Sequence, residues 1–226
     1  MNIEARLDEV RAEYTRRMHA GESRLLHEVT DYVTARNGKM LRPRMLLPAA
    51  ATLGEEHLMA KRTLLLAVCV EMLHNTSLLH DDIIDRADSR RGRPSVNARW
   101  NNGVAVLVGD YLLTQTMQIL DEVDDREATR RFNRTVQQMV EAELQQQPAP
   151  TGSQSAYLSI IDGKTASLFA TAAAFGNPAY EAFGLHYGRL FQLRDDLADG
   201  ELPPYGLQLI EQEERAIKQM DTVLNI

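Results

Sequence analysis

EMLHNTSLLHDDIIDRADSRRGRP, from Glu71 to Pro94, is the stretch that decides the fold. The part up to Ile84 carries the apolar residues of a packed helical face, which are Met72, Leu73, Leu78, Leu79, Ile83 and Ile84. Three aspartates, Asp81, Asp82 and Asp85, fall in the last turns of the same predicted helix, where Asp81 and Asp85 share one face. Carboxylates this close repel one another unless solvent, a cation or a basic partner offsets their charge. The stretch therefore predicts a buried helix that ends in a charged site.

The residue types at that site point to a metal and a phosphate. Hard carboxylate oxygens suit Mg²⁺, which typically takes one or two protein carboxylates and fills its other positions with water and phosphate oxygens. Arg90, Arg91 and Arg93 follow in the same stretch, and guanidinium groups bind phosphate through paired hydrogen bonds. An isolated D-D-x-x-D is more often a solvated helix end before a basic loop. The apolar run that leads into these carboxylates argues against that alternative.

Composition limits the class of protein. With 226 residues and 44% hydrophobic content, the chain can bury one substantial core, so we expect a single domain over residues 1–226. A net charge of -7 and a pI near 5.4 disfavour general nucleic-acid binding. Cys69 is the only cysteine and is expected in the core. The longest apolar run, from Leu64 to Val70, is too short to span a bilayer, which predicts a cytoplasmic protein without a transmembrane segment.

Helical periodicity continues on both sides of the central stretch. It predicts helices over residues 3–20, from about 23, over about 43–53, from 61 into the acidic site, and over 104–120, 127–147, 157–175 and 183–199, with a final amphipathic helix. Gly109 falls inside one of them, which indicates close packing. No strand-like alternation of useful length is present. The sequence therefore predicts an all-α helical bundle with a central substrate cavity.

A second acidic cluster repeats the first. Asp195, Asp196 and Asp199 have the same spacing, again after an apolar helical stretch, with Gln192 one turn upstream. Two such clusters are far less expected by chance than one. We expect them to face each other across the bundle and to hold several Mg²⁺ ions around one diphosphate.

Five further residues are candidates for binding an anion. Lys39 and Arg42 lie just before a predicted helix N-terminus, and His74 lies two turns before the first acidic cluster. Lys164 and Thr165 interrupt a run rich in alanine, leucine and phenylalanine. Each has a structural alternative, namely a solvated helix end, a satisfied core histidine or a snorkelling lysine.

Together these segments resemble the trans-isoprenyl diphosphate synthases of the polyprenyl or geranylgeranyl type. The matching pieces, in the family's order, are G-K-M-L-R-P, H-N-T-S-L-L-H-D-D-I-I-D with R-R-G-R-P, G-D-Y-L-L, G-K-T and F-Q-L-R-D-D-L-A-D, over residues 38 to 199. The resemblance implies the isoprenoid synthase fold, a homodimer and a Mg²⁺-dependent prenyltransferase. Such an enzyme extends an allylic diphosphate with isopentenyl diphosphate.

The resemblance also implies a role for each candidate residue. Isopentenyl diphosphate would be held by Lys39, Arg42 and His74, with Arg91. About three Mg²⁺ ions would be bound by Asp81, Asp85 and Asp195, assisted by Asp82, Asp196 and Asp199. The allylic diphosphate would be contacted by Arg90, Lys164, Thr165 and Gln192. The residues expected to assist departure of the diphosphate are Asp81, Asp82, Asp85, Asp195, Arg90 and Lys164.

Product length in this family depends on bulk just before the first acidic cluster. The small Thr76 and Ser77 occupy those places and predict products of C20 or longer, unless Met72, Leu73 or a neighbouring helix forms a deeper floor. One departure from the family is that GELPPYG leads directly to a final amphipathic helix. The family normally continues with a lysine-containing loop and further helices, and the lysine expected shortly after the second cluster is absent here.

Two other functions stay open. A non-catalytic subunit that regulates or completes another synthase would be marked by decayed acidic clusters, whereas both are intact. A class I terpene cyclase would carry an Asn/Ser/Glu metal motif and lack the pair Lys39 and Arg42. An unrelated di-metal bundle would need Glu-x-x-His pairs, which the sequence does not offer in the right places.

Overall fold

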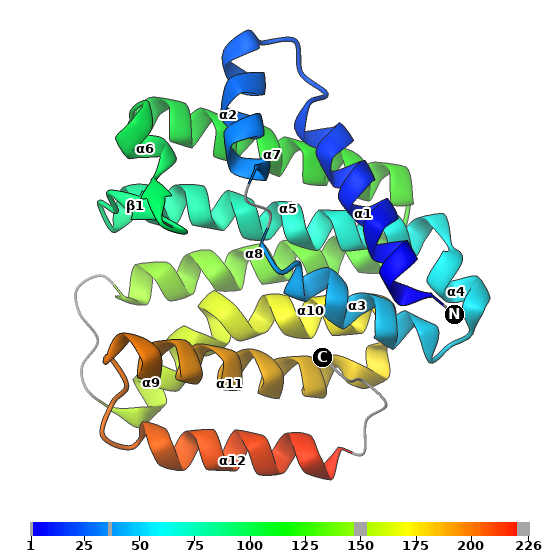
Figure 1. Cartoon of the computed structure of the whole chain (residues 1–226). Helices are drawn as coiled ribbons and strands as arrows, with labels where there is room; N and C mark the ends of the chain where they lie inside the picture. Colours follow the sequence, from blue (N-terminus) through cyan, green and yellow to red (C-terminus); the bar gives the residue numbers. More distant parts are fainter. Residues whose placement is uncertain (1, 36–37, 147–152, 221–226) are drawn as a thin grey trace. The chain divides into compact units, whose positions relative to one another are not determined.

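The computed structural model describes residues 2–35, 38–146 and 153–220 (Figure 1). This part of the chain is almost entirely helical, which confirms the predicted all-α fold. Its internal packing divides the chain into two compact units. The N-terminal unit contains Asn2–Pro43 and Ala60–Asp124, and the C-terminal unit contains Arg44–Met59 and the chain from Asp125 onward. The single domain over residues 1–226 stays a prediction.

The N-terminal unit is built around one long helix. Its elements are α1 (Ile3–Met18), α2 (Arg24–Thr34), α5 (Lys61–Ile84), β1 (Ser89–Arg90), β2 (Arg93–Pro94), α6 (Val96–Arg99) and α7 (Asn102–Val123). Helix α5 packs along α7 and against α1 (Figure 1). The periodicity of α1 predicts an apolar stripe of Ile3, Leu7, Val10, Tyr14 and Met18, and all of these except the half-buried Ile3 are buried. Helix α5 begins at Lys61, as predicted.

A short β-hairpin directly after α5 was not predicted. Ser89 pairs with Pro94 and Arg90 with Arg93 in an antiparallel ladder. The turn residues Arg91 and Gly92 both have positive φ, 53° and 74°, as in the turns that best match strand twist. Strands of two residues are too short to show an alternating pattern. The hairpin folds the basic segment back onto the end of α5.

Glycine in the middle of α7 allows a close contact with α5. A Cβ added at Gly109 would lie 2.3 Å from Nε2 of His80, so the imidazole occupies the space a side chain would need. The same nitrogen lies 3.6 Å from Oδ1 of Asp110. This confirms the close packing expected at Gly109. Cys69 is buried in α5, with Sγ 3.9 Å from the Thr116 carbonyl, which confirms its place in the core.

The C-terminal unit surrounds α11. Its elements are α4 (Glu55–Met59), α8 (Arg126–Gln146), α9 (Gln154–Ile161), the π-helical turn η1 (Asp162–Ala166), α10 (Ser167–Gly176), the 3₁₀ turn η2 (Pro178–Tyr180), α11 (Glu181–Asp199) and α12 (Gly206–Gln219). Helix α11 packs against α10 and α12 (Figure 1), and it also packs against η1. Helix α3 (Leu41–Ala51) includes the boundary between the units and begins two residues before the predicted start.

Two features of this unit differ from the prediction. Helix α4 was not expected, and the helix predicted over 157–175 is interrupted by η1. At η1, α11 approaches closely, because a Cβ on Gly188 would lie 2.5 Å from Cα of Ala166. A buried apolar cluster joins α9, α11 and α12, and it consists of Ile161, Leu193 and Leu209. These contacts fix η1 between the helices around it.

Two helices, α5 and α7, are long and apolar enough to cross a membrane by length and composition. The mostly buried core helix of a globular protein passes the same test, so these two helices do not overturn the prediction of no transmembrane segment. In α5, 72% of the most apolar window is buried inside the protein, against 44% in α7. Such burial in α5 is typical of the core helix of a globular domain.

Candidate active site

The first acidic cluster lies at the C-terminal end of α5. The N–H of Asp85, the first residue after the helix, donates to the Asp81 carbonyl at 2.8 Å, so the two residues lie one helical turn apart as predicted. Asp85 is exposed, whereas Asp82 has only 3% of its surface exposed. The cluster therefore contains two environments, one open to solvent and one buried.

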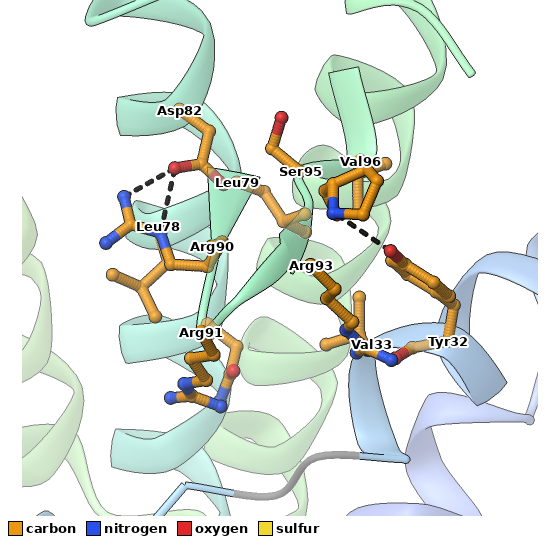
Figure 2. A pocket seen from close by; sticks show the side chains of 12 residues that line it. Tyr32, Val33, Leu78, Leu79, Asp82, Arg90, Arg91, Arg93, Ser95 and Val96 are labelled. Atoms are coloured by element: carbon orange, nitrogen blue, oxygen red, sulfur yellow. Dashed lines mark hydrogen bonds and ion pairs between the residues drawn. The ribbon is translucent and has the colours of Figure 1, made fainter. Parts of the chain in front are cut away.

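Arg90 explains how the buried carboxylate of Asp82 is accommodated. Nε of Arg90 donates to Oδ1 of Asp82 at 2.8 Å, and a terminal guanidinium nitrogen makes a second contact with the same oxygen (Figure 2). Nδ2 of Asn97 donates to the backbone carbonyl of Asp82 at 3.2 Å, so only Arg90 meets the carboxylate itself. A buried charge needs such partners, since its hydration is lost. The roles expected for Asp82 and Arg90 stay predictions, but here the two residues bind each other.

The hairpin directs its other arginines to different places. Figure 2 shows Arg93 turned toward Tyr32, and its guanidinium lies 3.8 Å from the ring centroid. The Tyr32 hydroxyl in turn donates to the Pro94 carbonyl at 2.8 Å. Arg93 therefore fastens the hairpin to α2. Arg91 lies instead against the G-K-M-L-R-P segment, where a Cβ on Gly38 would be 2.7 Å from its guanidinium.

His74 lies in a strongly cationic environment. Burial, followed by the charges of Arg42, Arg91 and Arg90, lowers the pKa of His74 well below its usual range. The imidazole is therefore neutral at neutral pH, and a neutral ring can donate a hydrogen bond to an anion without adding charge. The resemblance placed four residues of the N-terminal unit near diphosphates, Arg42, His74, Arg90 and Arg91, and the charges of these arginines act on His74 there. Lys39 lies on the same segment as Arg42 and is exposed.

Glu71, one turn before His74, is a buried acid that the sequence interpretation missed. Burial raises the pKa of its carboxyl, while the charges of Arg42 and Arg91 act in the opposite direction. Nδ2 of Asn75 donates to the Glu71 carbonyl at 2.8 Å. The available signal was a single glutamate within the apolar run LLLAVCVEML. Such a residue is rarely buried without a basic partner.

In the C-terminal unit, three predicted residues form one hydrogen-bonded chain. Oγ1 of Thr165 donates to Oε1 of Gln192 at 2.7 Å, and Nε2 of Gln192 donates to Oδ1 of Asp196 at 2.7 Å. The hydroxyl of Tyr157, which the sequence interpretation missed, donates to the other carboxylate oxygen. Burial and this bond raise the pKa of Tyr157, so the phenol remains a donor. Asp195 and Asp199 are exposed beside the anchored Asp196.

Lys164 is held by residues of α8. Its Nζ lies 2.7 Å from Oε2 of Glu143 and 3.1 Å from Oε1 of Gln146. Neither partner was predicted, because their approach depends on the packing of α8 against η1. The half-buried ammonium group therefore does not simply extend along the surface into water. Lys164 and Thr165 both lie on the π-helical turn η1, and such turns occur often at functional sites.

Among the residues that the structure describes, no group of three or more His, Cys, Asp or Glu side chains is arranged to hold a metal ion. Mg²⁺ usually takes few protein ligands and completes its shell with water and phosphate oxygens. The exposed carboxylates of the two clusters fit that mode of binding, with a phosphorylated ligand supplying the rest. Because the two clusters belong to different units, their facing each other stays a prediction.

Comparison with known proteins gives consistent matches. The polyprenyl synthetase family matches residues 23–208. An all-trans-nonaprenyl-diphosphate synthase (geranyl-diphosphate specific) of Rhodobacter capsulatus is 39% identical over 187 residues, which cover 77% of this chain and 57% of the relative. The heptaprenyl diphosphate synthase component 2 of Geobacillus stearothermophilus is 34% identical over 192 residues, covering 77% and 58%.

A solved structure agrees with these matches. The polyprenyl synthase of Caulobacter crescentus, crystallised with calcium and isoprenyl diphosphate, has a TM-score of 0.82 and 29% identity, covering 97% of this chain and 78% of that one. The chain thus spans less than two thirds of the length of the curated relatives that it matches. With the family match covering most of the sequence, the chain belongs to the polyprenyl synthetase family.

Proposed function

We propose that the protein is a Mg²⁺-dependent prenyltransferase that condenses isopentenyl diphosphate with an allylic diphosphate into a trans-polyprenyl diphosphate. The observation that carries this proposal is that desolvation and the charges of Arg42, Arg91 and Arg90 all act on His74 and lower its pKa well below its usual range. Guanidinium groups gathered in this way favour binding of a multiply charged anion. The exposed Asp85 and the half-buried Asp81 at the end of α5 supply a place for the accompanying cation.

The two substrates are assigned to different groups of residues. Isopentenyl diphosphate is held by Lys39, Arg42, His74 and Arg91, and the allylic diphosphate by Arg90, Lys164, Thr165 and Gln192. The proposed Mg²⁺ ligands are Asp81, Asp85 and Asp195, with Asp196 and Asp199. In this proposal Asp82 orients Arg90 through the contacts described above. Arg90 retains 40% side-chain exposure, so part of its guanidinium can still meet a ligand.

The residues present suit ionisation of an allylic diphosphate. Mg²⁺, when bound, neutralises charge on the departing diphosphate. Arg90 and Lys164 donate hydrogen bonds to the same group, so the allylic C–O bond breaks to leave a delocalised carbocation. The double bond of isopentenyl diphosphate then forms the new C–C bond, and a proton is lost to the released diphosphate. The apolar faces of the helices exclude water, which would otherwise quench the cation.

Small residues before the first cluster support a long product. Thr76 is buried, and Oγ of Ser77 donates to the His74 carbonyl at 2.9 Å, so the Ser77 side chain stays close to its own helix. Neither residue projects bulk from α5. We therefore propose products of C20 or longer.

A homodimer is the proposed assembly, and the protein is expected to act in the cytoplasm. Helix α7 exposes Leu107 and Met117, with 70% and 57% of their surfaces accessible, and also Val106. Large exposed apolar side chains along one helix are typical of an interaction surface. Sedimentation of the purified protein at several concentrations tests this assembly, with Leu107→Glu as the variant expected to give monomers.

A catalytic subunit of a two-component enzyme is the second candidate. The observation that favours it is the Geobacillus stearothermophilus relative, which is named as one component of a synthase. In that case the purified chain alone would give no turnover, and a partner subunit would restore it.

The decisive experiment is incorporation of radiolabelled isopentenyl diphosphate with dimethylallyl, geranyl, farnesyl or geranylgeranyl diphosphate, with and without Mg²⁺. We expect metal-dependent extension of farnesyl diphosphate that is lost in Asp81→Ala and in Asp195→Ala. Asp88→Asn, an exposed aspartate outside the cluster, is the matched control and should retain activity. A folded protein that extends none of the four primers would overturn the proposal for the chain acting alone.

A further inference from the structure

Arg189 of α11 joins two elements that lie far apart in the sequence. Its Nε and one terminal nitrogen bind the two carboxylate oxygens of Asp162, at 2.5 and 2.7 Å. Its other terminal nitrogen lies 3.5 Å from Oε1 of Glu213. Asp162 is the first residue of η1 and Glu213 lies in α12, so a single guanidinium connects η1 to α12. This paired geometry is the strongest that arginine offers to a carboxylate.

The α12 end of this network is buried. Glu213 is only 6% exposed, and its second oxygen lies 2.5 Å from Nδ1 of His186, one turn before Arg189. A buried carboxylate that loses a partner is strongly disfavoured, so Glu213 and Arg189 constrain each other. A second pair between the same helices, Arg194 and Glu214 at 2.7 Å, is exposed and does not reach η1. Exposed pairs of that kind contribute little.

The element that Arg189 holds carries two proposed substrate contacts. Lys164 and Thr165 lie within η1, between Asp162 at its start and Ala166 at its end. Gly188, the neighbour of Arg189, packs directly on Ala166, with no room for a Cβ. Both ends of η1 are therefore held by adjacent residues of α11. A π-helical turn is a rare, single-turn departure from the α-helix that is frequent at functional sites, and here contacts from α11 hold both of its ends.

We propose that Arg189 is a positioning residue that couples α12 to the diphosphate-binding turn. With Glu213 holding the guanidinium and His186 holding Glu213, Arg189 fixes Asp162 and thereby the direction of Lys164 and Thr165. The inference rests on the proposed function for its catalytic consequence. Its structural part is the link between α12 and η1, and this part does not depend on whether the protein is active. Helix α12 thus acts on the substrate site through Arg189.

Hydrogen exchange tests the link without requiring turnover. Glu213→Gln and Glu214→Gln are adjacent, isosteric changes on α12, and only Glu213 is connected to Arg189. We expect amides of residues 162–166 to exchange about tenfold faster in Glu213→Gln than in the wild type, and less than about twofold faster in Glu214→Gln. Faster exchange confined to α12 in Glu213→Gln would overturn the proposal.

Kinetics test the positioning role. Because Lys164 and Thr165 are assigned to the allylic diphosphate, Asp162→Asn and Glu213→Gln should each raise its KM by about tenfold and leave the KM for isopentenyl diphosphate within about twofold. The double variant should lose little more than either single variant, since both act through Arg189. The KM for the allylic diphosphate should rise less in Arg189→Lys than in Arg189→Met, because lysine keeps the positive charge. Equal rises in both KM values would contradict the assignment.

The two experiments separate the two proposals. If the wild type extends no primer but residues 162–166 still respond to Glu213→Gln, the proposed function fails and the link holds. If the wild type is active and those residues do not respond, the link fails and the proposed function holds.

Discussion

Asp82→Asn tests whether the second aspartate of the first cluster is structural. Asp82 has 5% side-chain exposure, and one of its oxygens receives two contacts from Arg90. Asparagine keeps the shape and one acceptor oxygen, so the substitution removes mainly the charge. The matched control is Asp85→Asn, three residues further along, where the carboxylate is exposed.

The expected loss in the free energy of unfolding of Asp82→Asn follows from how far Asp82 and Arg90 are exposed to solvent. Breaking a fully buried pair costs about 3–5 kcal/mol, and a hydrogen bond to a charged group contributes about 1.5–3 kcal/mol. Arg90 is 40% exposed and regains some hydration, so the lower range applies. We expect Asp82→Asn to lower the free energy of unfolding by about 2 kcal/mol. Asp85→Asn should change it by less than about 0.5 kcal/mol, because it also relieves repulsion within the cluster.

Thermal unfolding without added metal or diphosphate is the assay, since neither then contributes to stability. For a chain of this size, a loss of about 2 kcal/mol lowers Tm by about 4–8 °C. Urea unfolding gives the same comparison through the midpoint at unchanged slope. Equal Tm values for Asp82→Asn and Asp85→Asn would refute the assignment of Asp82 to Arg90. The assignment would also be refuted if Asp82→Asn were as stable as the wild type and lost only its Mg²⁺-dependent activity.

Three further predictions use other features. Gly188→Ala should destabilise the protein by about 3 kcal/mol in urea unfolding, because its Cβ would lie 2.5 Å from the Ala166 backbone; a loss under about 1 kcal/mol contradicts this packing. Since the folded pKa of His74 is lowered, its contribution to stability is present above the unfolded value of 6.5 and is lost as pH falls below it. Stability should therefore fall more steeply in the wild type than in His74→Asn, by up to about 1.4 kcal/mol per pH unit below that value, and equal slopes would contradict the neutral ring. Ser77→Phe should shorten the product in the radiolabel assay, whereas an unchanged product would place the pocket floor elsewhere.

Local sequence was enough to predict most helices and the spacing inside both acidic clusters. The stripe Leu7, Val10, Tyr14 and Met18 is buried as its period indicated, because that period is a property of the helix itself. The start of α5 at Lys61 was predicted for the same reason. Sequence reasoning missed the hairpin after α5, whose two-residue strands are too short for a periodic signal.

Only the tertiary structure decided which charged groups lose their water and which partners replace it. Asp82 and Asp85 are chemically identical, yet one is buried because the hairpin returns Arg90 to it. The pairing of Lys164 with Glu143 and the connection made by Arg189 likewise join residues from different helices. Periodicity depends on neighbours along the chain, so it can be read from the sequence. The environment of a charge depends on desolvation by distant segments, so it exists only once those segments have packed.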